Sequence, residues 1–112
     1  MISRAHRFHG YGSLKKVYRE GKSVRGGLIS LKYTNQNSDK PYRMAVVVSK
    51  KVHKSAVVRN RIRRRIYEVV RKLENQPKNG VDMVFTVFDE QIKDTPAPKL
   101  SKTLTDLVAK TD

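Results

Sequence analysis

Residues 43–73 read RMAVVVSKKVHKSAVVRNRIRRRIYEVVRKL, and this stretch decides the fold. The nearly continuous β-branched run Arg43–Ser49 predicts a strand buried on both faces. After a basic loop, residues 56–73 predict a long helix, because their apolar residues recur at helical spacing. These apolar residues are Val58, Ile62, Ile66, Val69, Val70 and Leu73. A strand followed by such a helix predicts a sheet on which the helix packs.

The N-terminal third predicts shorter elements. Residues 1–12 are basic and contain two glycines, which is typical of a flexible lead-in. Apolar residues at i, i+3 and i+4 then predict a short helix over 14–19, with Ser13 as its N-cap. Alternation of apolar and polar residues over 28–33 predicts a half-buried strand, and the polar stretch 34–41 predicts a turn.

The C-terminal third completes the expected fold. Residues 81–88 predict a second buried strand, and residues 89–98 an acidic connection that contains proline. Four apolar residues at helical spacing predict a terminal amphipathic helix; they are Leu100, Leu104, Leu107 and Val108. The order α-β-β-α-β-α, with a long helix between two strands, indicates a crossover between parallel strands. We therefore predict one domain over residues 1–112, a small α/β sandwich.

The composition is strongly basic. The 112 residues include 25 Lys and Arg but only 10 Asp and Glu, giving a formal net charge of +15. Repulsion among so many positive charges opposes compaction, so we expect a polyanionic partner. Nucleic acid is favoured over a membrane surface or an acidic protein. The absence of cysteine excludes disulfides and thiol catalysis. Without an apolar run of ~20 residues or a signal-peptide core, we expect a cytoplasmic protein with no membrane partner.

The predicted long helix begins with an unusual cluster of cations. Eight Lys and Arg occur from residue 50 to residue 65 without one acid, whereas exposed helices usually mix the two signs. Cations near the first turn oppose the helix dipole at a cost of about 0.3–1 kcal/mol each, and a bound phosphate would reverse that penalty. Asn60 and Tyr67 lie opposite the apolar stripe, where Tyr67 could stack on a base or cover the sheet edge. The alternative is a solvated basic face.

Val48-Ser49-Lys50-Lys51 followed by Arg59-Asn60-Arg61 resembles the protein subunit family of bacterial ribonuclease P. The resemblance covers most of the chain, including Gly21, Arg43 and Asp82. It implies a fold with an unusual left-handed β-α-β crossover. It also implies a protein cofactor that acts as one copy with one catalytic RNA, and this RNA removes the 5′ leader from precursor tRNA.

The same resemblance implies two RNA-binding sites. The arginine helix would meet the catalytic RNA through Lys50, Lys51, Lys54, Arg59, Asn60, Arg61, Arg63 and Arg64. A central cleft between the sheet and the N-terminal helix would hold the single-stranded leader, and its implied residues are Leu14, Tyr18, Tyr33 or Lys32, Ser49 and Tyr67. The chain departs from the family in having Leu14 and Tyr18 where phenylalanines are usual, and Asp89-Glu90 where the family is basic.

No catalytic residue and no protein metal site is predicted. The acids are scattered, and His6, His9 and His53 lack the spacing of a zinc site. The resemblance implies that Mg²⁺ ions bound mainly by the RNA partner support hydrolysis, so that the protein alone is inactive. The alternatives are a structural RNA-binding protein such as a ribosomal protein, and a protein-only ribonuclease. A helix-turn-helix DNA-binding protein fits worst, because strands flank the arginine helix.

Overall fold

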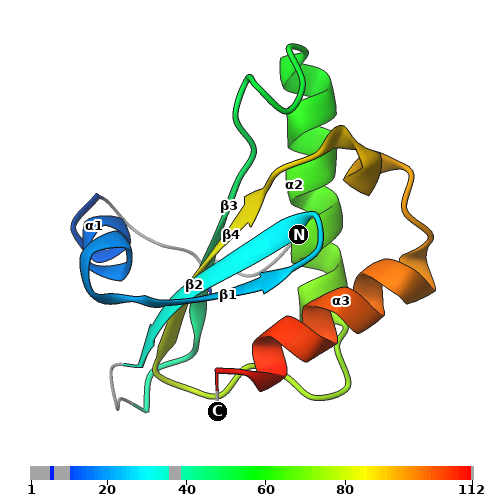
Figure 1. The fold of residues 1–112 in the computed structure, drawn as a ribbon. Helices are drawn as coiled ribbons and strands as arrows, with labels where there is room; N and C mark the ends of the chain where they lie inside the picture. Colours follow the sequence, from blue (N-terminus) through cyan, green and yellow to red (C-terminus); the bar gives the residue numbers. More distant parts are fainter. Residues whose placement is uncertain (1–5, 7–10, 36–38, 112) are drawn as a thin grey trace.

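The computed structural model has a four-stranded sheet with helices on both faces (Figure 1). It describes residues 6, 11–35 and 39–111, with the side chains of residues 11–13 left undescribed. The elements in chain order are α1 (Tyr11–Glu20), β1 (Lys22–Gly26), β2 (Ile29–Asn35), β3 (Arg43–Val47), α2 (Ala56–Arg71), β4 (Val81–Val87), the short 3-10 helix η2 (Glu90–Lys93) and α3 (Ala97–Ala109).

The strands lie in the order β1-β2-β4-β3. β2 pairs antiparallel with both β1 and β4, whereas β3 and β4 run parallel. Since α2 connects β3 to β4, the predicted helical crossover between parallel strands is confirmed. The hand of this crossover stays a prediction. The α/β class is confirmed, with one strand more than the sequence predicted.

The additional strand is β1, with the sequence KSVRG. It is short, polar and mostly exposed, so it carries little of the alternation that reveals a half-buried strand. Gly27 and Leu28 connect it to β2, and Gly27 has a φ of 67°. Glycine tolerates this left-handed conformation at no steric cost, and a two-residue hairpin loop requires it.

The N-terminal helix also differs from its prediction. Helix α1 begins at Tyr11, so Ser13 lies inside it and the predicted N-cap is wrong. Most of the predicted lead-in over 1–12 lies outside the described residues. The helix ends where expected, because the amide of Gly21 donates to the carbonyl of Val17 at 2.8 Å. A Cβ at position 21 would lie only 2.3 Å from that oxygen, so this turn requires glycine.

The main core lies between the sheet and helices α2 and α3. Ile62, Ile66 and Val70 of α2 are fully buried, and α3 buries all four of its predicted apolar residues. Strand β4 is buried on both faces, as predicted, but it ends at Val87, and Phe88, the last residue of the predicted strand, is exposed. Strand β3 is not, because α1 contacts mainly β2 and β4 on the other face, so the residues of β3 alternate between buried and partly exposed positions, starting with Arg43.

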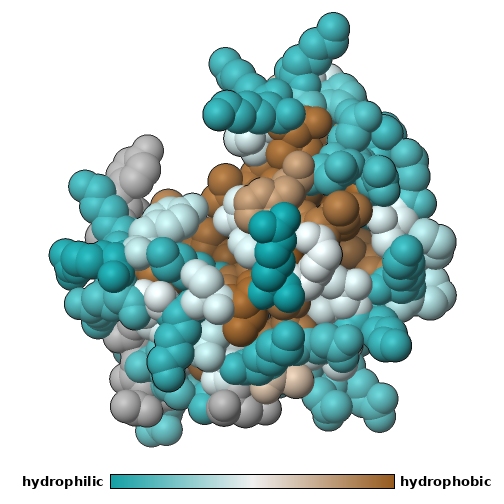
Figure 2. All heavy atoms as spheres, in the orientation of Figure 1, coloured by the Kyte–Doolittle hydropathy of each residue, from teal (hydrophilic) through white to brown (hydrophobic). Residues whose placement is uncertain are grey.

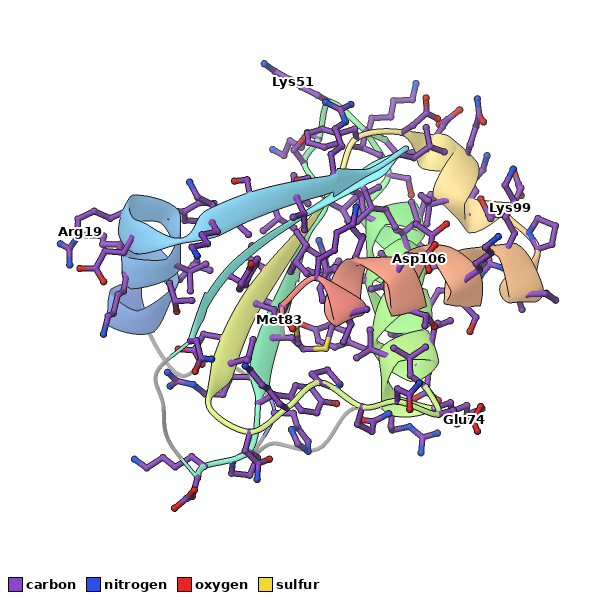
Figure 3. All side chains as sticks on the ribbon, turned by 60° about the horizontal axis from the view of Figure 1, so that its bottom comes forward. Arg19, Lys51, Glu74, Met83, Lys99 and Asp106 are labelled. Atoms are coloured by element: carbon purple, nitrogen blue, oxygen red, sulfur yellow. The ribbon has the colours of Figure 1, made fainter. Side chains whose placement is uncertain are left out.

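Helix α1 covers the other face of the sheet only in part. It contacts β2 and β4, where Val17 and Val84 are completely buried. Figure 3 shows the sheet between α1 on one side and α2 with α3 on the other. We call the sheet face on the α1 side the open face. Alternation along the strands assigns to it Ser30 and Lys32 of β2, Ala45 and Val47 of β3, and Val84 and Thr86 of β4.

A partly buried ion pair joins the parallel strands. Arg43 donates from Nε and Nη2 to the two carboxylate oxygens of Asp82, at 2.9 and 2.7 Å. Asp82 is 4% exposed, and its hydrogen bonds raise the pKa of Arg43. The two residues are register partners at the first residue of β3 and the second of β4. Their bidentate contact therefore fixes how these strands align.

Candidate nucleic-acid interface

The basic loop before α2 is held in a fixed conformation. Ser55 is the N-cap of α2, and its hydroxyl accepts a hydrogen bond from the amide of Val58 at 3.4 Å. The amide of Ser55 in turn donates to Nδ1 of His53 at 3.0 Å. Nε2 of His53 lies 3.6 Å from a carboxylate oxygen of Glu90. His53 thus connects the loop to the segment that follows β4.

Two arginines of α2 bind backbone carbonyls. Arg59 turns back over the loop, and its Nη1 donates to the carbonyls of His53 and Lys54, each at 2.9 Å. Arg65 reaches the η2 segment and donates to the carbonyl of Ile92 at 2.5 Å and to that of Thr95. Both guanidinium groups therefore stabilise the ends of neighbouring segments within the protein itself.

Other predicted cations point into solvent. The exposed ones are Lys50, Lys51, Lys54, Arg61 and Arg64. Within the described residues, Arg61 and Arg64 have no hydrogen-bonding or ion-pair partner. Arg63 is half-buried and donates to the side-chain oxygen of Asn60. We call the five exposed residues the cationic patch.

The lysines of the cationic patch lie at one end of the molecule, in the loop before α2, and Arg61 and Arg64 continue the patch along the helix. Lys51 lies at the outer tip of the loop between β3 and α2 (Figure 3). Hydrophilic side chains crowd this end in Figure 2, above a hollow that separates it from the α1 side. The hollow has hydrophobic surface at its floor. A polyanion could thus approach the patch and the open face together.

One acidic residue, Glu68, compensates cations at the other end of α2 instead. Glu68 pairs with Arg71 at 2.8 Å and with Lys72 at 3.9 Å, near the C-terminus of the helix. The guanidinium of Arg71 lowers the pKa of Glu68. The N-terminal half of α2 has no such partner in its own sequence, so its positive charges add to the positive end of the helix dipole. This arrangement favours an anion.

Three of the residues implied for the leader cleft lie at α1 and the open face. Tyr18 is 43% exposed, and Nζ of Lys32 lies 5.8 Å from the centre of its ring. Leu14 is half-buried one helical turn before Tyr18, on the same side of α1. Ser49 is exposed and lies just beyond β3, where alternation assigns it to the open face.

Tyr33 and Tyr67 lie on the opposite side of the sheet. The hydroxyl of Tyr33 donates to the carbonyl of Lys110, just after α3, at 3.1 Å. Tyr67 is half-buried and packs against the main core. Successive strand residues face opposite sides, so of the pair Tyr33 or Lys32 it is Lys32 that faces α1. Tyr67 fits the alternative of a core-covering residue.

Sequence reasoning missed one cation–aromatic pair on the open-face side. Phe88 is 47% exposed, and the guanidinium carbon of Arg25 lies 4.5 Å from the centre of its ring. Arg25 belongs to β1, the strand that the sequence did not predict. The sequence carries no signal for this pair, because Phe88 ends the predicted buried strand, is followed by Asp89 and Glu90, and has a cation partner that is distant in sequence.

The described residues contain no group of three or more histidines and acids that could hold a metal ion. No helix among them is long and apolar enough to span a bilayer. The fold and the cationic patch together define a small, basic α/β protein with a surface suited to a polyanion.

A family model described as Ribonuclease P matches residues 2–112. The chain therefore belongs to the ribonuclease P protein family, as the resemblance implied, and acts as a protein component in tRNA processing.

Relatives and solved structures agree with this assignment. The ribonuclease P protein component of Pseudanabaena sp. is 38% identical over 87 residues, covering 78% of this chain and 75% of the relative. That of Synechococcus elongatus is 31% identical over 114 residues, covering 99% and 93%. The structure of the RNase P protein from Thermotoga maritima has a TM-score of 0.80 at 20% identity, covering 93% of this chain and 96% of the other. The Staphylococcus aureus protein has a TM-score of 0.78 at 22% identity, covering 97% of both chains. At these identities, the structures support the fold alone.

Proposed function

We propose that the protein binds the catalytic RNA of ribonuclease P through its cationic patch and holds the 5′ leader of precursor tRNA on the open face. The observation that carries this proposal is the set of uncompensated cations around the first turns of α2. Phosphates would approach the helix dipole at its positive end and meet guanidinium groups that have no partner among the described residues. Binding would release counterions from the RNA and would weaken as salt increases.

The leader would lie in extended form between α1 and the strands. Tyr18 offers an exposed ring for stacking, and Lys32 beside it offers a charge for the RNA backbone. Leu14 contributes apolar contact but no stacking surface. Ser49 would connect this face to the cationic patch, because Lys50 and Lys51 follow it directly.

Hydrolysis would depend on Mg²⁺ ions bound mainly by the RNA. The protein would supply affinity for the substrate and screen phosphate repulsion, which would lower the Mg²⁺ concentration needed. One copy of the protein would act with one RNA. In this role the protein contributes positive charge and a leader site, and no general acid or base.

The test is cleavage of precursor tRNA at low Mg²⁺ by the protein alone, by a bacterial ribonuclease P RNA alone, and by both. We expect strong cleavage only by the combination. The matched variants are Arg61→Ala with Arg64→Ala in the cationic patch, and Lys99→Ala with Lys102→Ala on α3 as the control. Cleavage by the protein alone would indicate a protein-only nuclease. No stimulation in the combination would favour a structural RNA-binding protein.

A further inference from the structure

Two exposed aromatic rings lie on the same side of the sheet, each beside a cation. Among the described residues, the large apolar side chains that remain exposed are Tyr18, Val57 and Phe88. Tyr18 has Lys32 at 5.8 Å, and Phe88 has Arg25 at 4.5 Å. Both distances lie within the range of a cation–π contact. The pair of Phe88 and Arg25 is the one that neither the fold nor the proposed leader site explains.

The strand register places this second pair on the open face. Arg25 is the partner of Ser30, and Ser30 is the partner of Thr86. Phe88 follows Thr86 by two residues, and its amide donates to the carbonyl of Leu28 at 2.8 Å, so the strand pairing continues to this point. Residues two apart on a strand share a face. The alternate residue of β1, Gly26, faces the core, where a Cβ would meet Leu107.

We propose that Phe88 and Arg25 form a second stacking site for an unpaired base of single-stranded RNA. This inference rests on the proposed function, in which the leader crosses the open face. Phe88 lies four residues beyond Val84, which is the partner of Lys32, so the two sites are about 13 Å apart along the strand. An extended single strand that leaves Tyr18 could therefore continue to Phe88, next to the cationic patch.

The surroundings of Phe88 favour a base over a phosphate. Asp89 and Glu90 follow it directly, and both carboxylates already have partners within the protein. Asp89 accepts from the amide of Gln91 at 2.8 Å, and Glu90 faces His53 at 3.6 Å. Their negative charge would repel a phosphate from this end of the strand. A neutral ring flanked by a planar guanidinium instead offers two stacking surfaces, which every base can use.

The experiment uses the assembled holoenzyme and two precursor tRNAs, one with a long leader and one with a single leader nucleotide. We expect Phe88→Ala to raise the dissociation constant of the long-leader substrate roughly tenfold and to leave the short-leader substrate unchanged. Phe88→Trp should keep the affinity. A 2-aminopurine base in the long leader should be quenched by the wild type and by Phe88→Trp, but not by Phe88→Ala.

Arg25→Ala should also weaken binding of the long-leader substrate. Lys102→Ala, which removes an exposed cation from α3, should not. Equal weakening of both substrates by Phe88→Ala would overturn the inference, because the ring would then act on the catalytic RNA or on folding. The inference would also be overturned if Phe88→Ala left the affinity unchanged while the wild type still preferred the long leader. That result would leave the proposed function intact and favour a protein partner at this site. A wild type with no leader preference would remove the leader site and this inference together.

Discussion

Neighbouring arginines of α2 have different surroundings, and this decides what each substitution should do. Arg59 binds the carbonyls of His53 and Lys54, whereas Arg61 and Arg64 have no partner within the described residues. A guanidinium already engaged with the backbone contributes to folding even in the absence of RNA. A free, solvated one contributes little until a phosphate arrives.

Replacing Arg61 or Arg64 by Ala should therefore weaken RNA binding without lowering protein stability. We expect the slope of log affinity against log salt to fall by up to about one unit for each phosphate that the variant no longer neutralises. Arg59→Ala should also lower the free energy of unfolding, by about 1 kcal/mol, because two carbonyls lose a charged donor. Salt titrations of RNA binding and urea unfolding of the free protein measure the two effects. Equal loss of stability in all three variants would contradict this division.

Gly27 is a position at which the contribution of backbone conformation to stability can be measured alone. Its φ is 67°, and a Cβ at this position would meet no atom within 4 Å. Gly27→Ala should therefore destabilise the protein by about 1 kcal/mol through backbone strain alone. Gly27→Asn should cost less, since Asn adopts left-handed conformations more readily. Urea unfolding compares the two variants, and an unchanged midpoint for Gly27→Ala would show that the hairpin loop relaxes.

At the scale of elements, α2 depends on one buried stripe. Ile66 is completely buried in the main core, whereas Val57 of the same helix is 68% exposed. Ile66→Ala should lower the free energy of unfolding by about 2–5 kcal/mol, from the apolar burial that is removed and the cavity left behind. The matched control Val57→Ala should change it by less than about 0.5 kcal/mol. Chemical unfolding monitored by circular dichroism tests both variants. A similar loss of unfolding free energy in the two would mean that the stripe is misassigned.

Elements were predictable from the sequence where their own residues carry the pattern. The stripe of α2 and the four apolar residues of α3 have a helical periodicity that burial confirms, and the apolar run of β4 is buried on both faces. Strand β1 has no such pattern, because an edge strand receives its order from the hydrogen bonds of β2. Strand β3 was expected to be buried on both faces, but the run of β-branched residues cannot show whether a helix covers the second face.

The same distinction decides which residues of the candidate site could be predicted from the sequence. Exposure of Arg61 and Arg64 follows from their positions away from the apolar stripe of α2, and the structure agrees. Tyr33 could not be separated from Lys32, because the choice depends on which sheet face α1 covers. Phe88 and Arg25 are far apart in the sequence and meet only through the pairing of three strands. Partners of this kind require the folded sheet.

At the scale of the whole molecule, the net charge of +15 links stability to RNA binding. Self-repulsion among so many cations destabilises the compact state, and added salt screens it. The same salt competes with RNA for the cations. Between about 50 mM and 200 mM salt, the melting temperature of the free protein should therefore rise while its affinity for RNA falls.

Thermal unfolding of the free protein and RNA titrations, both across this salt range, test these opposite trends. Arg61→Glu with Arg64→Glu should reduce both salt dependences, because the net charge falls and the patch loses its phosphate partners. Lys99→Glu with Lys102→Glu makes the same change of charge on α3. It should reduce the salt dependence of stability alone, since these residues lie outside the cationic patch. A melting temperature that falls as salt increases would mean that attractive surface ion pairs such as Arg71 with Glu68 outweigh the self-repulsion.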